Sequence, residues 1–480
     1  MKKLLALLTA LLIALSCLSG CGGADSKKKK PSADKNDITI TVWSGDGGAQ
    51  AVWEELVDDW NDTEGREKNI FIKWETVMDA SQLDVAFQND TLPDIIGVGS
   101  HIQSEKIRKA GKEIPLEDLP GGKEFLEEYD QPGIEGVTMF DGKQYGVRRK
   151  ATTAGLVYNK DLFKKAGIVD ENGEAKAPTT VAEVREYAKK IQALGGKVYG
   201  FAFPLKFGLG YTVNTLTQNS FDIKNPVSKT DLDAKTVSLV GYKDRYQWIL
   251  DMKKDGTVFP AAEALDNDTA RSYFASGIIG MIPAVSWDVG VYTTQFETKC
   301  DWDVCPFPVL DGREECSPYT AQGGSMSISS TAVKDGYDSP RAKAAMEVYK
   351  FIYSLKTRAT LFERGTDLSC KTDVLEVVDE SKMDPRFLKF ASFVDPYYKD
   401  YDEESYAVEG ETWAVLFQKV WMGEISLDAA IKDYEKRSTD GLRKAIAKGE
   451  YDVAKQKATI AQKEADYAEK KAKLAEAAAK

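Results

Sequence analysis

After residue 37, short apolar runs alternate with amphipathic segments, in a pattern typical of strands separated by helices. Residues 38–43 are rich in β-branched side chains, which predicts a strand. Residues 49–60 then repeat apolar side chains at helical spacing, and the strand–helix order returns over 70–74, 80–87 and 94–98. Strands that are separated by helices indicate a parallel sheet with helices on both faces.

The same alternation continues along the rest of the chain, whose 480 residues suffice for two domains with a core each. Thr180 and Glu183 have the spacing of a capping box, which predicts that a helix begins there. The further predicted strands are 156–158, 198–203, 278–282 and 325–328, and the further predicted helices are 161–167, 180–194, 244–255, 270–276 and 340–354.

The last forty residues, 441–480, are rich in alanine and contain no proline. Apolar residues recur at every seventh position, namely Ile446, Val453, Ile460, Tyr467 and Leu474. This pattern predicts one long helix with a narrow apolar stripe. The helix could pack on its own domain, associate with another chain, or be partly frayed.

Charge and motifs exclude several classes of function. The chain has 64 Lys+Arg and 76 Asp+Glu, a net charge of −12, which argues against nucleic-acid binding. His101 is the single histidine, so H-E-x-x-H zinc sites are excluded, and no phosphate-binding loop motif is present. We therefore expect no cofactor, no metal and no enzyme; a glycosidase with two carboxylates is a remote alternative.

The N-terminus predicts export. Lys2 and Lys3 precede an apolar run over 4–16 that is too short to span a membrane, which indicates a signal peptide over 1–20. The ending Leu18-Ser19-Gly20-Cys21 resembles the bacterial lipobox, which implies a multiply acylated Cys21 on the outer face of the cytoplasmic membrane. An ordinary signal peptide that contains cysteine is the alternative. Residues 21–36 carry few apolar side chains and predict a flexible tether.

Four further cysteines, Cys300, Cys305, Cys316 and Cys370, follow in the body of the chain. Export permits disulfides. One disulfide within 300–316 and free thiols are both open interpretations, and the spacings fit no common metal site.

Several segments follow one another in the order of a known pattern. The most specific of them reads Leu-Val-Tyr-Asn-Lys-Asp-Leu-Phe-Lys-Lys-Ala-Gly over 156–167. The other segments are 92–95, 141–147, 178–180, 274–281 with Trp287, 323–328 and 423–430. Over about residues 37–440 the chain resembles the extracellular solute-binding proteins of family 1, the sugar-binding components of bacterial ABC importers.

The resemblance implies an α/β, two-lobed periplasmic-binding-protein-like fold with interlobe hinge strands, here followed by the long C-terminal helical tail. The expected segments are 37–147 and 328–372 for lobe one, 148–327 and 373–440 for lobe two, and 441–480 for the tail. The implied function is to capture a carbohydrate, an oligosaccharide in particular, in the interlobe cleft and to deliver it to an ABC permease, as a monomer. Alternatives are an acidic sugar or another anionic solute, and presentation of the ligand to a membrane sensor.

A sugar ring needs an aromatic plate for its apolar face and polar groups for its hydroxyl rim. Trp287 is the predicted plate, because it follows a predicted strand and matches the family's tryptophan. Asp46 lies in the glycine-rich loop after the first strand, where it could accept two hydroxyl bonds or cap a helix. Trp43 and Ser44 close that strand and are included as candidates, with core packing the alternative for Trp43.

Five further candidates lie near other predicted strand ends or crossings. His101 follows the third strand and could bond the ligand or lie on the surface. Arg148 and Arg149 begin a basic run, ending at Lys150, where the family usually has proline; they could pair with carboxylates or grip an acidic sugar. Gly323 and Gly324 at the second crossing would permit close approach of a ligand.

Overall fold

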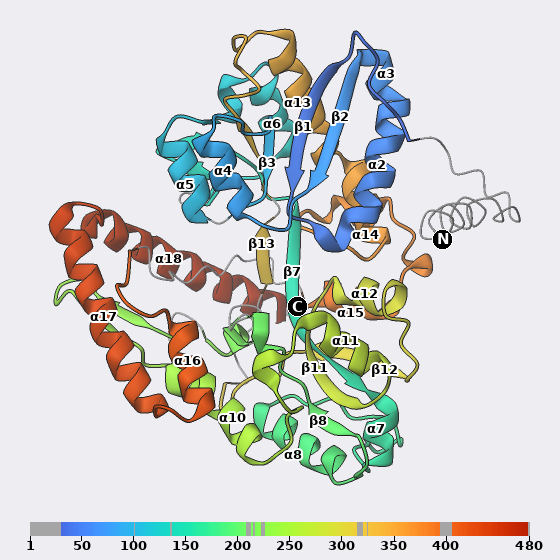
Figure 1. Ribbon diagram of the computed structural model, residues 1–480, viewed down its shortest axis with the longest axis vertical. Coiled ribbons are helices and arrows are strands. Elements are labelled where there is room, and N and C mark those ends of the chain that lie inside the picture. Colours follow the sequence, from blue (N-terminus) through green and yellow to red (C-terminus); the bar gives the residue numbers. More distant parts are fainter. Residues whose placement is uncertain are drawn as a thin grey trace, which may run out of the picture.

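A computed structural model describes residues 30–99, 101–134, 137–207, 213–214, 217–221, 226–313, 320–323, 325–393 and 406–478. The predicted signal peptide, Cys21 and most of the predicted tether lie outside these ranges, as do Cys316 and Gly324. The described residues form two lobes that are stacked one above the other in Figure 1.

The upper lobe in Figure 1, lobe one, is built on a five-stranded sheet with the order β2-β1-β3-β14-β4. Its strands are β1 (Ile38–Ser44), β2 (Ile70–Thr76), β3 (Ile95–Gly97), β4 (Glu113–Ile114) and β14 (Ser327–Ser329). The helices around it are α2 (Gln50–Asp62), α3 (Glu64–Lys68), α4 (Ser81–Gln88), α5 (His101–Lys109), α6 (Gly122–Tyr129), α13 (Pro340–Tyr353) and α14 (Leu355–Glu363). A small hairpin of β5 (Met139–Phe140) and β6 (Lys143–Gln144) completes the lobe.

The lower lobe, lobe two, is built on a sheet with the order β12-β7-β11-β8. Its strands are β7 (Lys150–Asn159), β8 (Tyr199–Phe201), β11 (Ile279–Val285) and β12 (Trp302–Pro306). Two short strands, β13 (Thr320–Gly323) and β15 (Leu368–Ser369), pair with the first half of β7. β9 (Lys229–Asp231) and β10 (Thr236–Ser238) form a separate antiparallel pair. The helices are α7 (Lys160–Lys165), α8 (Val181–Gln192), α10 (Tyr242–Lys254), α11 (Asn267–Ala275), α12 (Asp288–Thr294), α15 (Pro385–Ser392), α16 (Trp413–Met422), α17 (Leu427–Lys448) and α18 (Val453–Ala478).

Each lobe buries its own apolar core. In lobe one, Trp53 and Trp60 of α2 pack with the sheet and with tyrosines of α13. In lobe two, one cluster joins α8, α10, α16 and α17 to the sheet, and a second lies under α11, α12 and α15. The expected two-lobed α/β fold is confirmed by these separate cores and by the sheets that they cover.

The sheets differ from the all-parallel arrangement that the alternation predicts. In lobe one β14 runs antiparallel to β3 and β4, and in lobe two β7 runs antiparallel to β11 and β12. The chain passes between lobes more than once, so strands that return from the other lobe enter each sheet in the opposite direction. β7 begins at Lys150, six residues before the predicted strand 156–158. The apolar pattern did not predict this first half of the strand, because it carries the polar Thr152 and Thr153.

The helix termini partly follow the sequence. Thr180 caps α8 as predicted, since its hydroxyl accepts a bond from the Glu183 amide. The predicted C-terminal helical tail is confirmed, but residues 441–480 do not form one helix: they contain the end of α17 and the separate helix α18. α17 ends at Lys448, and Gly449 after it has φ 73°, a left-handed backbone that glycine adopts without strain. Asp452 then accepts bonds from the first amides of α18, so a second helix starts there.

The chain enters the fold along lobe one. Lys30 pairs with Glu54 of α2 at 2.8 Å, and Arg66 of α3 pairs with Asp34 at 2.5 Å. The residues just before β1 therefore lie against the α2–α3 side of lobe one. Among the described helices, none is long and apolar enough to cross a membrane.

Gly155 of β7 is packed so closely that a larger side chain would not fit. A Cβ at this position would lie 2.6 Å from Cε1 of Phe390 and 2.7 Å from the carbonyl oxygen of Cys305. Gly155→Ala is therefore expected to lower the free energy of unfolding by about 1–3 kcal/mol, the usual cost of overpacking. Gly290→Ala in α12 is the control, since its Cβ would meet nothing nearer than 3.5 Å. Thermal unfolding of both variants checks this, and equal melting temperatures would contradict the packing argument.

Candidate functional site

The carboxyl ends of β1 and β3 meet at the edge of lobe one that faces lobe two. β1 pairs in parallel with β3, so Ser44 and Gly97 lie side by side. The Gly45 amide donates to the Gly97 carbonyl at 3.0 Å, which joins the two following loops. The loop that carries Asp46 therefore lies at the strand ends, where ligands of such sheets bind.

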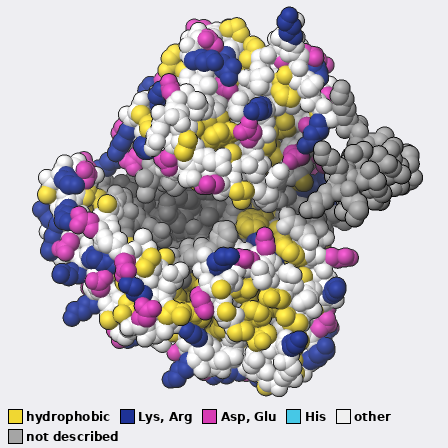
Figure 2. All heavy atoms as spheres, viewed as in Figure 1, with side chains coloured by type: hydrophobic (Ala, Val, Ile, Leu, Met, Phe, Trp, Pro, Cys, Tyr) yellow, Lys and Arg dark blue, Asp and Glu magenta, His cyan; other side chains and the backbone are white. Residues whose placement is uncertain are grey.

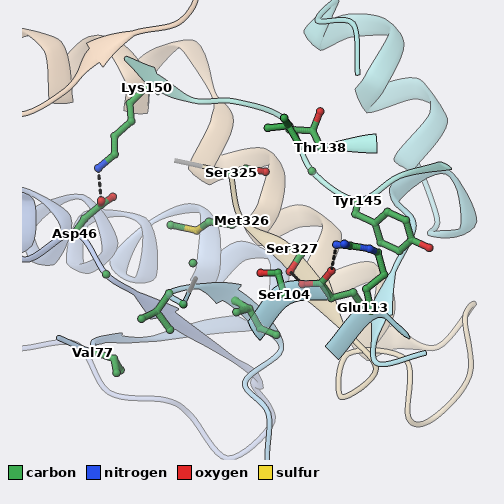
Figure 3. Close-up of a pocket in the computed structure, with 18 of the residues that line it drawn as sticks. Asp46, Val77, Ser104, Glu113, Thr138, Tyr145, Lys150, Ser325, Met326 and Ser327 are labelled. Carbon is green, nitrogen blue, oxygen red and sulfur yellow. Dashed lines mark hydrogen bonds and ion pairs between the residues drawn. The ribbon is translucent and has the colours of Figure 1, made fainter. Parts of the chain in front are cut away.

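A cavity of about 430 Å³ opens at this edge of lobe one, within the usual range of small-molecule sites. Figure 3 shows its two ends, with Asp46 and Lys150 at one and Glu113 and Tyr145 at the other. Its charged residues are Asp46, Arg108, Glu113 and Lys150; its hydroxyls belong to Ser104, Thr138, Tyr145, Ser325 and Ser327; and its apolar side chains include Val77, Met78, Ile96, Val98, Phe140 and Met326. On the face drawn in Figure 2, the surface is hollowed between the two lobes.

One end of the cavity is formed by four paired charges, which we call the crossing network: the buried Arg149 and Asp367 and the partly buried Lys150 and Asp46. Arg149 and Lys150 both pair with Asp46, and the Arg149–Asp46 distance is 2.5 Å. Both cations also pair with Asp367, which precedes β15. The Arg149 side chain is 1% exposed. The network therefore ties the first loop of lobe one to the start of β7.

Burial and charge act in opposite directions within the crossing network. Burial alone would raise the pKa of Asp46, but Lys150 and Arg149 lower that pKa to about 2. Burial likewise would lower the pKa of Lys150, yet Asp367 and Asp46 raise it. Asp46 and Lys150 are therefore both charged at neutral pH, as their ion pair requires.

Arg149 and Lys150 of the basic run thus pair with carboxylates, one of the two interpretations of that run. Asp46 makes no helix-capping bond, so that alternative for Asp46 is wrong. Arg148 is buried beside the network, and its carbonyl accepts bonds from the Tyr129 hydroxyl and the Gln131 amide. Contact of any of these residues with a ligand stays a prediction.

Trp287 comes from lobe two and reaches the same loop of lobe one. It directly precedes α12, and its ring atom Cε3 lies 3.8 Å from the place that a Cβ on Gly48 would occupy. The guanidinium of Arg271 lies 5.1 Å from the Trp287 ring and is itself paired with Asp288 at 2.6 Å. The predicted plate therefore lies where the two lobes meet.

The remaining candidates lie at or near this edge with different surroundings. Ser44 is fully buried, and its hydroxyl accepts a bond from the Asp46 amide. Trp43 donates to Glu75 and packs on a small apolar cluster that includes Ile96 of the cavity lining, but Trp43 itself does not line the cavity. His101 begins α5, and Gly323 pairs with Lys150 across β13 and β7. Their ligand contacts stay predictions, and Gly324 lies outside the described residues.

The far end of the cavity was not predicted from the sequence. Glu113 and Ser327 become neighbours only through the pairing of β4 with β14, 214 residues apart along the chain. Tyr145 stands inside a family-like segment but carries no chemical signal of its own. The four-residue spacing of Ser104 and Arg108 on one helix face is the one local pattern that could have indicated this end.

The structure describes two of the cysteines that were considered for a disulfide within 300–316, and it bears on the metal prediction for the described residues. Cys300 and Cys305 are free thiols, and burial raises the pKa of Cys300 to about 11. Cys316 lies outside the described residues, so its pairing stays open. Within the described ranges, no three His, Cys, Asp or Glu side chains gather as they would around a metal ion.

Residues 44–359 match the family of bacterial extracellular solute-binding proteins. The chain is 26% identical over 334 residues to the sn-glycerol-3-phosphate-binding periplasmic protein UgpB of Brucella abortus, covering 68% of this chain and 73% of that protein. It is 31% identical over 157 residues to the diacetylchitobiose-binding protein DasA of Streptomyces coelicolor, or 32% and 35% of the two chains. The maltose/maltodextrin-binding domain MalE of Bdellovibrio bacteriovorus, solved with maltotriose, aligns at a TM-score of 0.62 and 18% identity, over 85% of this chain and all of that one.

The low pKa of Asp46 predicts an acid-sensitive stability. Its folded pKa of about 2 lies below the ordinary value of about 4, so its ionised form stabilises the fold above pH 4 and this contribution is lost as the pH falls towards 2. Asp46→Asn should lower the free energy of unfolding at pH 7 by about 3 kcal/mol, because it breaks a buried pair. Below pH 4, the free energies of unfolding of Asp46→Asn and of the unmodified chain should become more similar.

Asp433→Asn is the matched control for this measurement. Asp433 pairs with Arg437 one helical turn away, and its side chain is 54% exposed. Such surface pairs contribute about 0–1 kcal/mol, so little change is expected. Chemical denaturation of both variants between pH 7 and pH 2.5 measures the effect. A pH-independent loss in Asp46→Asn would show that charge is not its source.

Proposed function

Because the chain belongs to the bacterial extracellular solute-binding proteins, we propose that it captures a neutral oligosaccharide between its lobes and delivers it to the permease of an ABC importer. The observation that carries this proposal is the lining of the cavity, where opposite charges are already paired and hydroxyls and aromatic rings are gathered. The family consists of binding proteins, so no bond of the solute is made or broken.

The charges of the cavity favour an uncharged ligand. Lys150 is held by Asp46 and Asp367, and Arg108 is held by Glu113 at 3.2 Å. An anion would have to compete with these buried carboxylates for each cation. A sugar hydroxyl both donates and accepts, so it can bond to a paired cation and carboxylate together without upsetting their balance.

Aromatic surface supports the same ligand class. Phe140 and Tyr145 line the far end of the cavity, and Trp287 approaches the near end from lobe two. Aromatic rings cover the apolar face of a pyranose, and this supply lies on both sides of the interlobe contact. The names of DasA and of the Bdellovibrio MalE structure also refer to oligosaccharide ligands.

An anionic solute is the second candidate. It is favoured by the identity of 26% to a glycerol-3-phosphate-binding protein over 334 residues. For such a ligand, Arg149 or Lys150 would have to release a carboxylate of the crossing network. Closure of the lobes on the ligand would then coincide with rearrangement of those pairs.

Attachment to the membrane completes the proposal. Cys21 would carry the lipid, on the evidence of its lipobox-like context. The chain would then be held on the outer face of the cytoplasmic membrane, near the permease that it serves.

A thermal-shift screen tests the ligand class. The full chain is heated with neutral oligosaccharides, monosaccharides, uronates and sn-glycerol 3-phosphate. A ligand at 100 times its dissociation constant stabilises the fold by about 2.7 kcal/mol, which is readily detected. Stabilisation by neutral oligosaccharides supports the proposal. Stabilisation by the anions alone would replace it with the second candidate.

Trp287→Ala tests the aromatic plate. If the ring stacks on the sugar, its loss should weaken the affinity for the saccharide found in the screen by at least about tenfold, or 1.4 kcal/mol. Isothermal titration calorimetry measures this affinity. Trp421→Ala is the control, because Trp421 donates to Glu263 and packs in the core of lobe two, away from the Gly48 loop that Trp287 reaches. A smaller effect at Trp287 than at Trp421 would remove Trp287 from the site.

A further inference from the structure

The far end of the cavity is a built polar corner that the crossing network does not reach. Ser104 and Arg108 come from α5, Glu113 from β4, Ser327 from β14, and Phe140 and Tyr145 from the hairpin region. In Figure 3 this corner lies at the opposite end from Asp46 and Lys150, with Ser325 and Met326 between them. The cavity is therefore elongated, with one polar group of residues at each end.

Arg108 is fixed in this corner from two directions. Its guanidinium lies 3.2 Å from the centroid of the Phe140 ring, and one of its nitrogens donates to Glu113. Its side chain is 10% exposed. Among the residues that the structure describes, Glu113 is the hydrogen-bond partner of this guanidinium, which has five N–H donors. Because Arg108 lines the cavity, its other donors are within reach of a ligand there.

Glu113 acts through Arg108 rather than on a ligand. One of its carboxylate oxygens accepts from Arg108 and the other accepts from the Ser327 hydroxyl at 3.0 Å. Its side chain is 2% exposed, so it is a buried positioning residue. It also neutralises Arg108, which makes the corner a poor site for a lone anion and a suitable one for hydroxyls.

From this geometry we infer that Arg108 determines ligand length, by binding the hydroxyls of a second sugar unit whose first unit lies at the Asp46–Lys150 end. The inference rests on the proposed function and deepens it. The planar guanidinium can donate to two neighbouring hydroxyls, while the Tyr145 and Phe140 rings provide apolar surface beside them. Ligands of at least two units are then preferred over single sugars.

Matched sugar pairs test the inference with the full chain. The probes are D-xylose and xylobiose, D-glucose and maltose, and N-acetylglucosamine and diacetylchitobiose, titrated by calorimetry. The pair that binds the unmodified chain is then used with Arg108→Lys, which keeps the charge on Glu113 but loses the planar fork. The ratio of disaccharide to monosaccharide affinity should fall by about tenfold or more, the usual effect of a hydrogen bond to a charged group.

Two further variants keep the test decisive. Arg108→Met combined with Glu113→Gln removes both charges, so that neither is left buried alone, and should lower the same ratio. Arg341→Lys is the control, because Arg341 makes a similar lobe-one pair with Asp94, at 2.7 Å, outside the cavity lining. It should leave the ratio unchanged. Melting temperatures of all variants report any loss of structure.

The outcomes separate the two claims. A fall in the affinity ratio with Arg108→Lys and none with Arg341→Lys supports the inference. Equal losses for monosaccharide and disaccharide, or a loss of melting temperature alone, would give Arg108 a structural role and overturn it while saccharide binding stands. Binding of no saccharide by the unmodified chain would overturn the proposed function, and the inference with it.

Discussion

Four paired charges gathered at one point, the crossing network, set the geometry on which both lobes depend. Arg149, Lys150, Asp46 and Asp367 lie where the chain passes from lobe one into β7. A buried charge is tolerated only when it is paired, so none of the four can move alone without a large cost in free energy. The position of the Asp46 loop relative to β7 is thereby fixed, and with it the near end of the cavity and the loop that Trp287 approaches.

Much of the architecture could be predicted from local pattern. The β-branched run at 38–43 and the helical spacing over 49–60 correspond to β1 and α2, and Thr180 caps α8 as its spacing indicates. Strand direction could not be predicted in this way. Whether β14 or β7 runs parallel or antiparallel depends on which lobe the chain has come from, and no local periodicity records that.

The site was predictable only where it follows a strand end. Asp46 stands in the loop after the first strand, which is sufficient to place it at the cleft edge. Its partner Arg149 is 103 residues away, so the pairing itself depends on the crossing of the chain between lobes. Arg108 and Glu113 carry no family-like motif, and their shared corner exists only because β4 and β14 are adjacent in the sheet.

Because the chain enters the fold along α2 and α3, an N-terminal tether would be attached to lobe one. Lys30 and Asp34 lie against Glu54 and Arg66, so any upstream attachment pulls on lobe one first. Lobe two is joined to lobe one through the strands and loops of the crossing and, among the described residues, through Lys455 of α18, which pairs with Asp141 of the β5–β6 hairpin at 3.9 Å. On a tethered molecule, opening and closing would then move lobe two, together with α16, α17 and α18. Lobe one would keep its orientation towards the membrane surface.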